Sequence, residues 1–413
     1  MPNHWLCKFV LALALALLCT GCGDTFRPVA TPLTGSPPDP QAFHLAVTVS
    51  VNTPGSAGSN MSIDVSGDTR FSSVNVGHNP VHAAVLPTGA TTRVYVANQG
   101  DDTVSSYAAS SQAPPVTTTQ LPAGAAPNFV HSSETSNMYV SMPGISSVGV
   151  ISVASNALRA TVPVGPNPVA LAESPDGKHL YSMNQGNDTV SSINTPDDTV
   201  NPAISLPGGS SPVWGVMSSA GLLYVLNQGN GTISIIQPGP DVIVGTLTVA
   251  PGANYEFFDA HLNRLYVTNP VANTLTIFDL GQSPNVLLAT VPVAPGAISV
   301  TALADGTRAY VASSQSNGST ASGTVSVIDT TSNTVRKTIA IPAVAVVGVC
   351  NSARFRVSTA SSPDSSKVYV ANCDGGGTDV IRTSNDTLVR NLQAPISTQF
   401  PIPQNPVWVM TTQ

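Results

Sequence analysis

Charged side chains are scarce in this sequence. They make up 9% of its 413 residues, whereas an average soluble domain has about 25%. The formal net charge is −7 and no basic stripe is visible, so nucleic acid is not expected as a partner. Heptads and a three-residue glycine period are missing, which excludes a coiled coil and collagen. Hydrophobic residues reach 42%, too many for a disordered chain, and 33 Gly and 35 Pro indicate an all-β chain rich in turns.

No apolar run is long enough to span a membrane, and the longest of the short ones lies at the N-terminus. Residues 1–22 contain Lys8 as their only charged side chain, followed by an apolar run at residues 9–18. This pattern is typical of a secretory signal, and the run is shorter than the roughly 20 residues of a transmembrane helix. The segment ends in a way that resembles the lipobox of bacterial lipoproteins. Thr20, Gly21 and Cys22 match that motif, whereas Cys19 stands where Leu is usual.

The lipobox resemblance implies that residues 1–21 are a signal peptide and that Cys22 is acylated, for example with palmitate. The lipid bilayer is then a partner, and the protein is anchored to it without spanning it. The alternative is an ordinary secreted protein cut nearby. Gly23 follows the cysteine where an Asp would favour retention in the inner membrane, so the resemblance favours the outer membrane of the cell envelope, with a periplasmic or surface-exposed domain.

Residues 22–42 contain five prolines and no apolar period, which predicts an extended, semi-rigid tether. The folded domain is then expected over residues 43–413. Only two of the five cysteines belong to it, Cys350 and Cys373, because the other three lie in residues 1–22. In an oxidising compartment two cysteines suggest one disulfide, and two free buried thiols are the alternative.

A four-residue phrase that begins with tyrosine recurs along the chain. The steps from one tyrosine to the next are 44, 42, 43, 42, 44 and 59 residues, between Tyr95, Tyr139, Tyr181, Tyr224, Tyr266, Tyr310 and Tyr369. Each period contains four short β signals, most clearly at residues 169–172, 180–184, 189–193 and 203–206. Four antiparallel strands in about 40–45 residues are the signature of a β-propeller blade. The long last step predicts an insertion at residues 343–351.

The two chain ends complement each other. Residues 405–410 read as a first strand without a second, and residues 49–52, 61–65 and 71–76 read as strands two to four. Joining them makes a shared blade that closes the ring and leaves no exposed sheet edge. Residues 43–413 divided among eight blades give about 46 residues per blade. Eight blades are therefore favoured, with seven as the alternative.

The repeated phrase is similar to the YVTN β-propeller repeat family, whose name matches Tyr266, Val267, Thr268 and Asn269 letter for letter. The resemblance extends over about residues 80–390. It implies an all-β propeller of four-stranded antiparallel blades. The family occurs largely in secreted or surface proteins of prokaryotes, including surface-layer-like proteins, and many members have no established activity.

The repeated tyrosines and asparagines favour structural roles. A tyrosine on a central strand packs between blades, and its hydroxyl needs one partner. The asparagines suit turn capping because their side chains bond nearby backbone; they are Asn98, Asn184, Asn227, Asn269 and Asn372.

Two histidines and two tryptophans are candidate ligand-binding residues in the channel. His82 and His131 lie two and four residues after equivalent prolines on predicted first strands, so both can face the channel and bind a metal or a haem. Trp214 and Trp408 each lie two residues after a proline, and they can stack on a flat or sugar-like ligand. For all four, packing in the channel wall is the alternative.

Signatures of catalysis are missing. The sequence has no GxSxG, HExxH or glycine-rich phosphate loop, and its acidic turns do not match a calcium loop. No catalytic residue, metal or cofactor is therefore expected. The favoured function is a monomeric binding or scaffold module for an envelope protein or glycan. The alternative is a periplasmic or surface enzyme, either lactonase-like or with a metal or haem held by His82 and His131.

Overall fold

The computed structural model describes residues 44–52, 55–88, 91–132, 136–316, 319–345, 348–351, 353–393 and 405–412. All of them belong to the unit Phe43–Gln413, which is described by itself. The expected signal peptide, the acylation site at Cys22 and the tether lie outside the described residues. In the described part of the chain, no helix has the length and apolar character needed to cross a bilayer.

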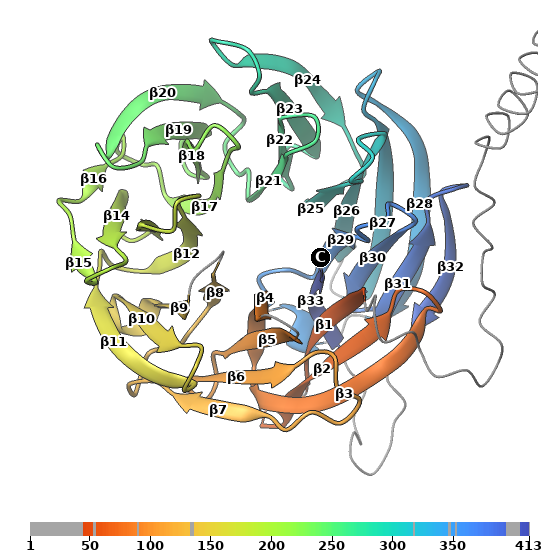
Figure 1. The fold of residues 1–413 in the computed structure, drawn as a ribbon. Helices are drawn as coiled ribbons and strands as arrows, with labels where there is room; N and C mark the ends of the chain where they lie inside the picture. Colours follow the sequence, from red (N-terminus) through yellow and green to blue (C-terminus); the bar gives the residue numbers. More distant parts are fainter. Residues whose placement is uncertain are drawn as a thin grey trace, which may run out of the picture. The chain divides into compact units, whose positions relative to one another are not determined.

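The unit is an eight-bladed β-propeller (Figure 1). Each blade is an antiparallel sheet whose first strand lies nearest the axis, and the blades are numbered here from 1 to 8 along the chain. Blade 3 shows the pattern expected from the sequence, with β12 (Pro168–Glu173), β13 (His179–Asn184) and β14 (Thr189–Asn194). Its outer strand is broken into β15 (Thr199–Val200) and β16 (Ile204–Ser205), which both pair with β14.

The other blades repeat this order with an unbroken outer strand. Blade 1 contains β4 (Pro80–Thr88), β5 (Thr91–Asn98), β6 (Thr103–Ala108) and β7 (Thr117–Gln120), and blade 2 contains β8 (Phe129–His131), β9 (Asn137–Met142), β10 (Ser147–Ser152) and β11 (Ala157–Pro163). Blade 4 contains β17 (Pro212–Met217), β18 (Leu223–Asn227), β19 (Thr232–Gln237) and β20 (Val242–Thr248), and blade 5 contains β21 (Tyr255–Asp259), β22 (Arg264–Asn269), β23 (Thr274–Asp279) and β24 (Val286–Pro292). Blade 6 contains β25 (Ala297–Ala302), β26 (Arg308–Ser316), β27 (Thr320–Asp329) and β28 (Thr334–Ala345), and blade 7 contains β29 (Val357–Ser361), β30 (Lys367–Asn372), β31 (Gly377–Arg382) and β32 (Thr387–Leu392). Two 3₁₀ turns, η1 (Pro143–Ile145) and η2 (Gly348–Asn351), lie between strands.

Blade 8 joins the two ends of the propeller. Its inner strand is β33 (Asn405–Thr411), followed by β1 (Leu45–Val51), β2 (Ala57–Asp64) and β3 (Thr69–His78). The pairing places Val49 opposite Trp408, and the Thr412 backbone N–H donates to the Leu45 carbonyl oxygen at 2.8 Å. The predicted closure is therefore confirmed, and the ring has eight blades rather than seven.

Several of the repeated tyrosines connect their blade to the next one. They are buried on second strands, and the Tyr181 and Tyr310 hydroxyls donate to Asp241 and Asp386 at 2.6 Å. Both aspartates lie in the turn between the third and fourth strands of the following blade, in a left-handed conformation that Asp tolerates. Each residue thus shapes its own turn and binds the tyrosine of its neighbour.

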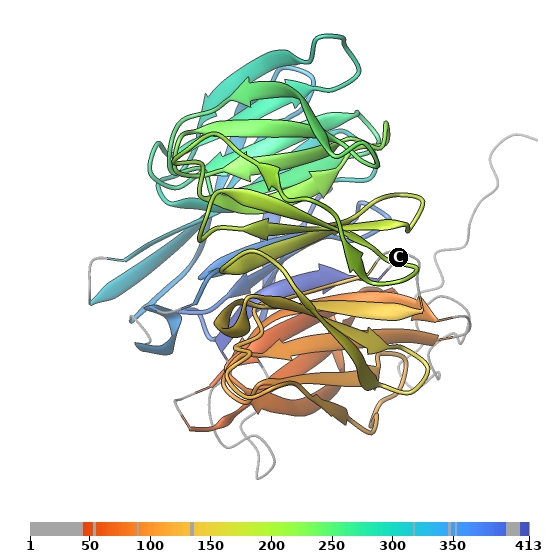
Figure 2. The ribbon, with the colours of Figure 1, turned by 90° about the vertical axis from the view of Figure 1, so that its left-hand side faces the viewer.

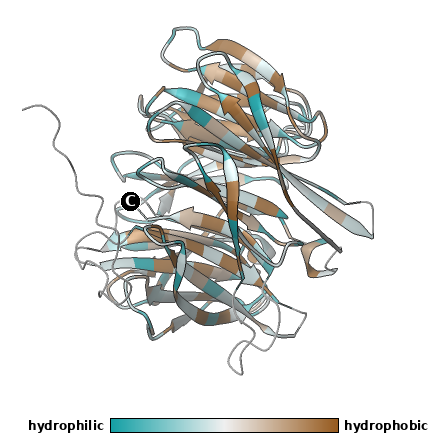
Figure 3. Cartoon of the chain, turned by 90° about the vertical axis from the view of Figure 1, so that its right-hand side faces the viewer, coloured by the Kyte–Doolittle hydropathy of each residue, from teal (hydrophilic) through white to brown (hydrophobic). Residues whose placement is uncertain are grey.

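The repeated asparagines brace their own hairpins. The Asn184 Nδ2 donates to Thr189 Oγ1 at 3.0 Å and to Ser191 Oγ at 2.9 Å, across the turn from β13 to β14. Asn98 and Asn227 make the same two contacts in their blades. Along the strands, hydrophobic residues (brown) are interspersed with paler and hydrophilic (teal) ones (Figure 3).

The extra length of the last repeat is distributed over two places. Ser313 pairs with Thr324 where the equivalent residues of blade 3 lie five apart, so part of the extra length forms a longer β26–β27 hairpin. This hairpin extends past its neighbours (Figure 2). Only the remainder lies before β29, where η2 is found. The sequence placed the whole insertion at residues 343–351, because the spacing of the tyrosines gives the total extra length of a repeat and not where within the repeat the extra residues lie.

Candidate functional site

Six ring-bearing side chains from six blades meet at the centre of the propeller. This axial cluster consists of His82, Phe129, Trp214, Tyr255, Phe355 and Trp408, and each is less than 10% exposed. Trp214 on β17 and Trp408 on β33 belong to opposite blades of the ring, yet their ring centroids are 6.2 Å apart. The middle of the axis is therefore filled with side chains.

The rings of the axial cluster contact one another in stacked and edge-to-face arrangements. His82 stacks on Phe129 with centroids 4.0 Å apart, and it lies 4.5 Å from Trp408. Trp214 lies 4.7 Å from Tyr255 and meets Phe355 edge-on at 5.7 Å. Such pairs add to the stabilisation that burial of the rings provides, so the cluster is a packed core.

Arg354 spans the ring beside the axial cluster. From the segment before β29 in blade 7, its Nη1 donates to the Val169 carbonyl at 2.7 Å and its Nη2 to the Val213 carbonyl at 2.8 Å. Its guanidinium also lies 5.0 Å from the Trp214 ring centre. Burial lowers the pKa of Arg354 to about 10, so the side chain stays charged at neutral pH. No sequence signal singled out this arginine.

The two candidate histidines are neutral at neutral pH. Burial, together with the nearby Arg354 and His131 charges, lowers the pKa of His82 well below its ordinary value. Burial lowers the pKa of His131 to about 4. The Val130 backbone N–H donates to His82 Nδ1 at 3.4 Å, which leaves Nε2 as the protonated nitrogen.

The structure brings three of the four predicted channel residues together. His82, Trp214 and Trp408 belong to the axial cluster, and His131 lies close enough to influence the His82 pKa. Among the residues with described positions, no group of three or more His, Cys, Asp or Glu side chains is arranged to hold a metal ion. The remaining rings of the cluster were not singled out by sequence reasoning, although Phe129 and Tyr255 lie at the starts of inner strands.

A cavity of about 580 Å³ opens at the end of the axis where the inner strands finish, and it is called here the wide mouth. Tyr255 and Trp408 line it from the axial cluster, and Phe257 lies beside them. Hydroxyl-bearing residues from three neighbouring inner strands form much of its wall, namely Thr301, Thr359, Ser361 and Thr411. Asp259 and His261 also line it.

The wall hydroxyls are held in place by one another. The Thr301 hydroxyl donates to Ser361 Oγ at 3.2 Å, and Ser361 Oγ donates to the Ala302 carbonyl at 2.8 Å. The Thr411 hydroxyl donates to the Ser361 carbonyl at 2.8 Å. This arrangement orders the polar groups of the wide mouth.

The opposite end of the axis carries a smaller and more polar cavity of about 330 Å³, called here the narrow mouth. Arg354 and Phe355 line it from the axial side. Four side-chain amides lie around them, on Asn128, Gln185, Gln228 and Asn254. The axial cluster therefore separates two mouths of different chemistry.

A buried carboxyl lies between blades 4 and 5. Glu256 on β21 is 1% exposed, and neither carboxyl oxygen accepts a hydrogen bond of normal geometry from the described residues. Burial raises the pKa of Glu256 well above its usual value, and the Val216 backbone opposes this only in part. Glu256 is not among the residues that line either mouth.

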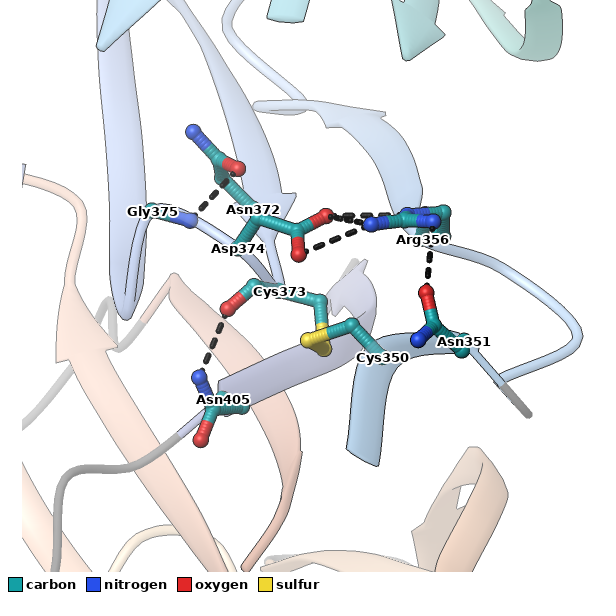
Figure 4. The surroundings of a disulfide bond; sticks show 8 residues. All are labelled: Cys350, Asn351, Arg356, Asn372, Cys373, Asp374, Gly375 and Asn405. Atoms are coloured by element: carbon teal, nitrogen blue, oxygen red, sulfur yellow. Dashed lines mark hydrogen bonds and ion pairs between the residues drawn. A yellow bond between two sulfur atoms is a disulfide. The ribbon is translucent and has the colours of Figure 1, made fainter. Parts of the chain in front are cut away.

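Cys350 and Cys373 form a disulfide in the structure, with their Cα atoms 5.8 Å apart (Figure 4). It joins η2 to the residue that follows β30. The Arg356 guanidinium pairs with the Asp374 carboxylate at 2.8 Å beside it, and Asn405 Nδ2 donates to the Cys373 carbonyl at 2.8 Å. The segment before β29 is thereby fixed to its own blade and to the start of β33, close to Arg354 in sequence.

No family model matches the chain, and no curated protein matches it. Solved structures do. Dihydro-heme d1 dehydrogenase NirN in complex with DHE matches with a TM-score of 0.68 and 11% identity, over 92% of this chain and 78% of that chain. AztD from Citrobacter koseri matches with a TM-score of 0.63 and 12% identity, over 90% and 98%.

A putative 6-phosphogluconolactonase from Bacteroides fragilis matches with a TM-score of 0.54 and 14% identity, over 91% of this chain and 100% of that chain. At these identities the similarity shows the fold alone, because one propeller architecture hosts unrelated functions. The assignment to the YVTN repeat family stays a prediction. The chain is an eight-bladed β-propeller.

Proposed function

We propose that this protein is a lipid-anchored, extracytoplasmic propeller that binds an envelope ligand in the wide mouth. The observation that carries the proposal is the filled axis. Because the axial cluster closes the middle of the ring, a ligand has two separate mouths to bind in, and the wide mouth is the larger of them. Propellers commonly present binding faces at the ends of such a rigid scaffold.

The lining of the wide mouth favours a ligand that bears hydroxyl groups, such as a glycan. The half-buried Phe257, beside the largely buried Tyr255 and Trp408, supplies aromatic surface on which the apolar face of a sugar stacks. The ordered hydroxyls of Thr301, Ser361 and Thr411 supply hydrogen-bonding groups at fixed positions. An apolar floor with a few placed polar groups is the usual composition of a small-ligand site.

The metal or haem form of the enzyme alternative would place its chemistry at His82 and His131, whereas the lactonase-like form names no residues. The His82 Nδ1 already accepts the Val130 N–H, and the ring is packed between Phe129 and Trp408. Haem or metal binding there would require the axial cluster to open. This geometry favours binding over catalysis.

Tryptophan fluorescence tests the binding proposal. The full chain with Trp5→Phe retains only Trp214 and Trp408, both in the axial cluster. Titration with neutral trisaccharides and soluble peptidoglycan fragments should give a saturable change in emission. Ala304→Arg places a long side chain at an exposed position of the wide mouth without adding a fluorophore and should abolish the change. Ala203→Arg, at an exposed position of blade 3, is the matched control and should keep it.

Two results would overturn the binding proposal. One is the absence of a saturable change with every probe, and the other is an unchanged response in Ala304→Arg. Stoichiometric metal or a coloured group that His82→Ala releases would support the enzyme alternative instead.

Labelling with palmitate tests the anchor separately. Incorporation by the full chain that is lost in Cys22→Ser and kept in Cys350→Ser would support acylation at Cys22. Equal incorporation by both variants, or none by the unmodified chain, would contradict it.

A further inference from the structure

Arg354 in the narrow mouth has no acidic partner among the residues with described positions. Other arginines of the propeller do have one: Arg308 lies 2.6 Å from Asp386 and Arg356 lies 2.8 Å from Asp374. The contacts of the Arg354 guanidinium are two backbone carbonyls and the faces of aromatic rings. A charge held in this environment is costly unless a group of opposite charge comes close.

One asparagine of the narrow mouth has its carbonyl oxygen occupied. The Ser141 hydroxyl, from the second strand of the same blade, donates to Asn128 Oδ1 at 2.5 Å. Asn128 is thereby oriented, and its NH₂ group remains as a donor on the other side of the amide. Asn254 lies near the Thr268 hydroxyl, which is 3.3 Å from Asn254 Oδ1 and 3.1 Å from the Ile298 carbonyl oxygen.

The side-chain carbonyl oxygen of Gln185 is also occupied, in this case by another side-chain amide. Its Oε1 accepts a hydrogen bond from Asn167 Nδ2 at 3.0 Å, so its Nε2 remains as a donor. Together with Asn128 and Asn254 it belongs to the lining of the cavity that contains the Arg354 guanidinium. Two oriented amides and the Asn254 amide thus offer donors, and one arginine offers a positive charge.

We propose that the narrow mouth is a binding site for a small oxyanion, the carboxylate, sulfate or phosphate group of a polar metabolite. A planar guanidinium and several amide N–H groups that surround one cavity are the donors that such groups need. The cavity of about 330 Å³ has room for more than a single inorganic ion. The site is independent of the wide mouth, because the axial cluster lies between them.

Thermal unfolding of the full chain at constant ionic strength tests the anion site. Sulfate, inorganic phosphate and acetate, each compared with chloride, should raise the melting temperature in a saturable way. The first two probe tetrahedral anions and the third probes a planar one. A ranking among them identifies which group the site prefers.

Asn254→Asp is the most informative variant. The aspartate has nearly the same shape as the asparagine and adds a negative charge inside the narrow mouth. It should weaken the affinity for the preferred anion about tenfold or more, the effect of losing one charge-assisted contact. Arg354→Met should do the same. Arg159→Met, which removes an arginine paired with Asp198 on the surface, is the control and should leave the affinity unchanged.

Either of two outcomes overturns the proposal. The unmodified chain can respond to all three anions as it does to chloride, which would make Arg354 a purely structural link across the ring. Alternatively, Asn254→Asp can fold and keep the anion response of the unmodified chain, which would place the anion elsewhere. The Asp variant keeps the test decisive even where Arg354→Met does not fold.

Discussion

Replacing Glu256 by Gln should make the folded protein more stable at neutral pH. The carboxyl is buried between blades 4 and 5, and burial raises its pKa well above the usual value of 4.5. The folded state therefore holds a proton on Glu256 that the unfolded state releases above about pH 4.5. Stability from this group is fully present below that pH and is lost as the pH rises towards the pKa of the folded state.

The size of the effect follows from the cost of that proton. Keeping this carboxyl protonated above its unfolded pKa of 4.5 costs about 1.4 kcal/mol for each pH unit, up to the raised pKa of the folded state. Glutamine has nearly the same shape and needs no proton. It places two N–H donors where the acid places one O–H, which reduces the gain. We expect Glu256→Gln to raise the free energy of unfolding by about 1–2 kcal/mol at pH 7.

Urea unfolding of the full chain at pH 4, 5.5 and 7 measures this effect. The gain from Glu256→Gln should be largest at pH 7 and should turn into a loss at pH 4, where the acid is protonated in the folded state and largely so in the unfolded state, and the extra N–H donor of Gln remains as a cost. Asp197→Asn is the control, since Thr199 hydrogen bonds lower the pKa of this exposed carboxyl and the sign is opposite. A loss of stability in Glu256→Gln at pH 7, or an equal gain at pH 4 and 7, would refute the reasoning.

Three further predictions concern other parts of the ring. Replacing Cys350 and Cys373 together by Ser should lower the free energy of unfolding by about 3 kcal/mol, because a disulfide across a 23-residue separation removes that much loop-closure entropy from the unfolded chain. Guanidinium unfolding without reductant measures this loss, and an unchanged midpoint would contradict it. Tyr310→Phe should lower the free energy of unfolding by about 1–2 kcal/mol because it loses a 2.6 Å hydrogen bond to a buried carboxylate. Tyr95→Phe loses only a 3.4 Å contact and should lower it less. Equal losses of stability in urea unfolding would argue against the tyrosine links. Burial lowers the pKa of His131 to about 4, so the unfolded state takes up a proton on this side chain at a higher pH than the folded state does. The free energy of unfolding should therefore fall by about 1–3 kcal/mol from pH 6.5 to pH 4. Thermal unfolding of His131→Gln should show a smaller fall, and a pH profile identical to that of the unmodified chain would contradict this prediction.

Much of the fold could be predicted from the sequence because one pattern repeats. The tyrosines mark second strands, and their spacing fixes the blade length. The C-terminus supplies one strand and the N-terminus three, so counting the strands at the two ends predicted the closure of the ring. The pairing of β33 with β1 is as expected. The positions after equivalent prolines also placed His82, Trp214 and Trp408 on inner strands, where they do meet.

The chemistry of the two mouths could not be predicted, because it depends on contacts between blades that are distant in sequence. Arg354 reaches the carbonyls of Val169 and Val213, which lie 185 and 141 residues away. Nothing local marks an arginine for such a role. The tyrosine partners left a weak signal: Asp241 follows Tyr181 by 60 residues, at the turn of the next blade. An alignment of the repeats that compares each tyrosine with the residue about 60 positions later would have identified these partners.

Quenching of tryptophan fluorescence by acrylamide tests the filled axis most directly. In the full chain with Trp5→Phe, the emission comes from Trp214 and Trp408 alone, which are 6% and 9% exposed. The account predicts weak quenching in the folded protein and a severalfold increase once urea unfolds it. Quenching of the folded protein as strong as that of the unfolded chain would mean that the axis is open to solvent, and the division into two mouths would be wrong.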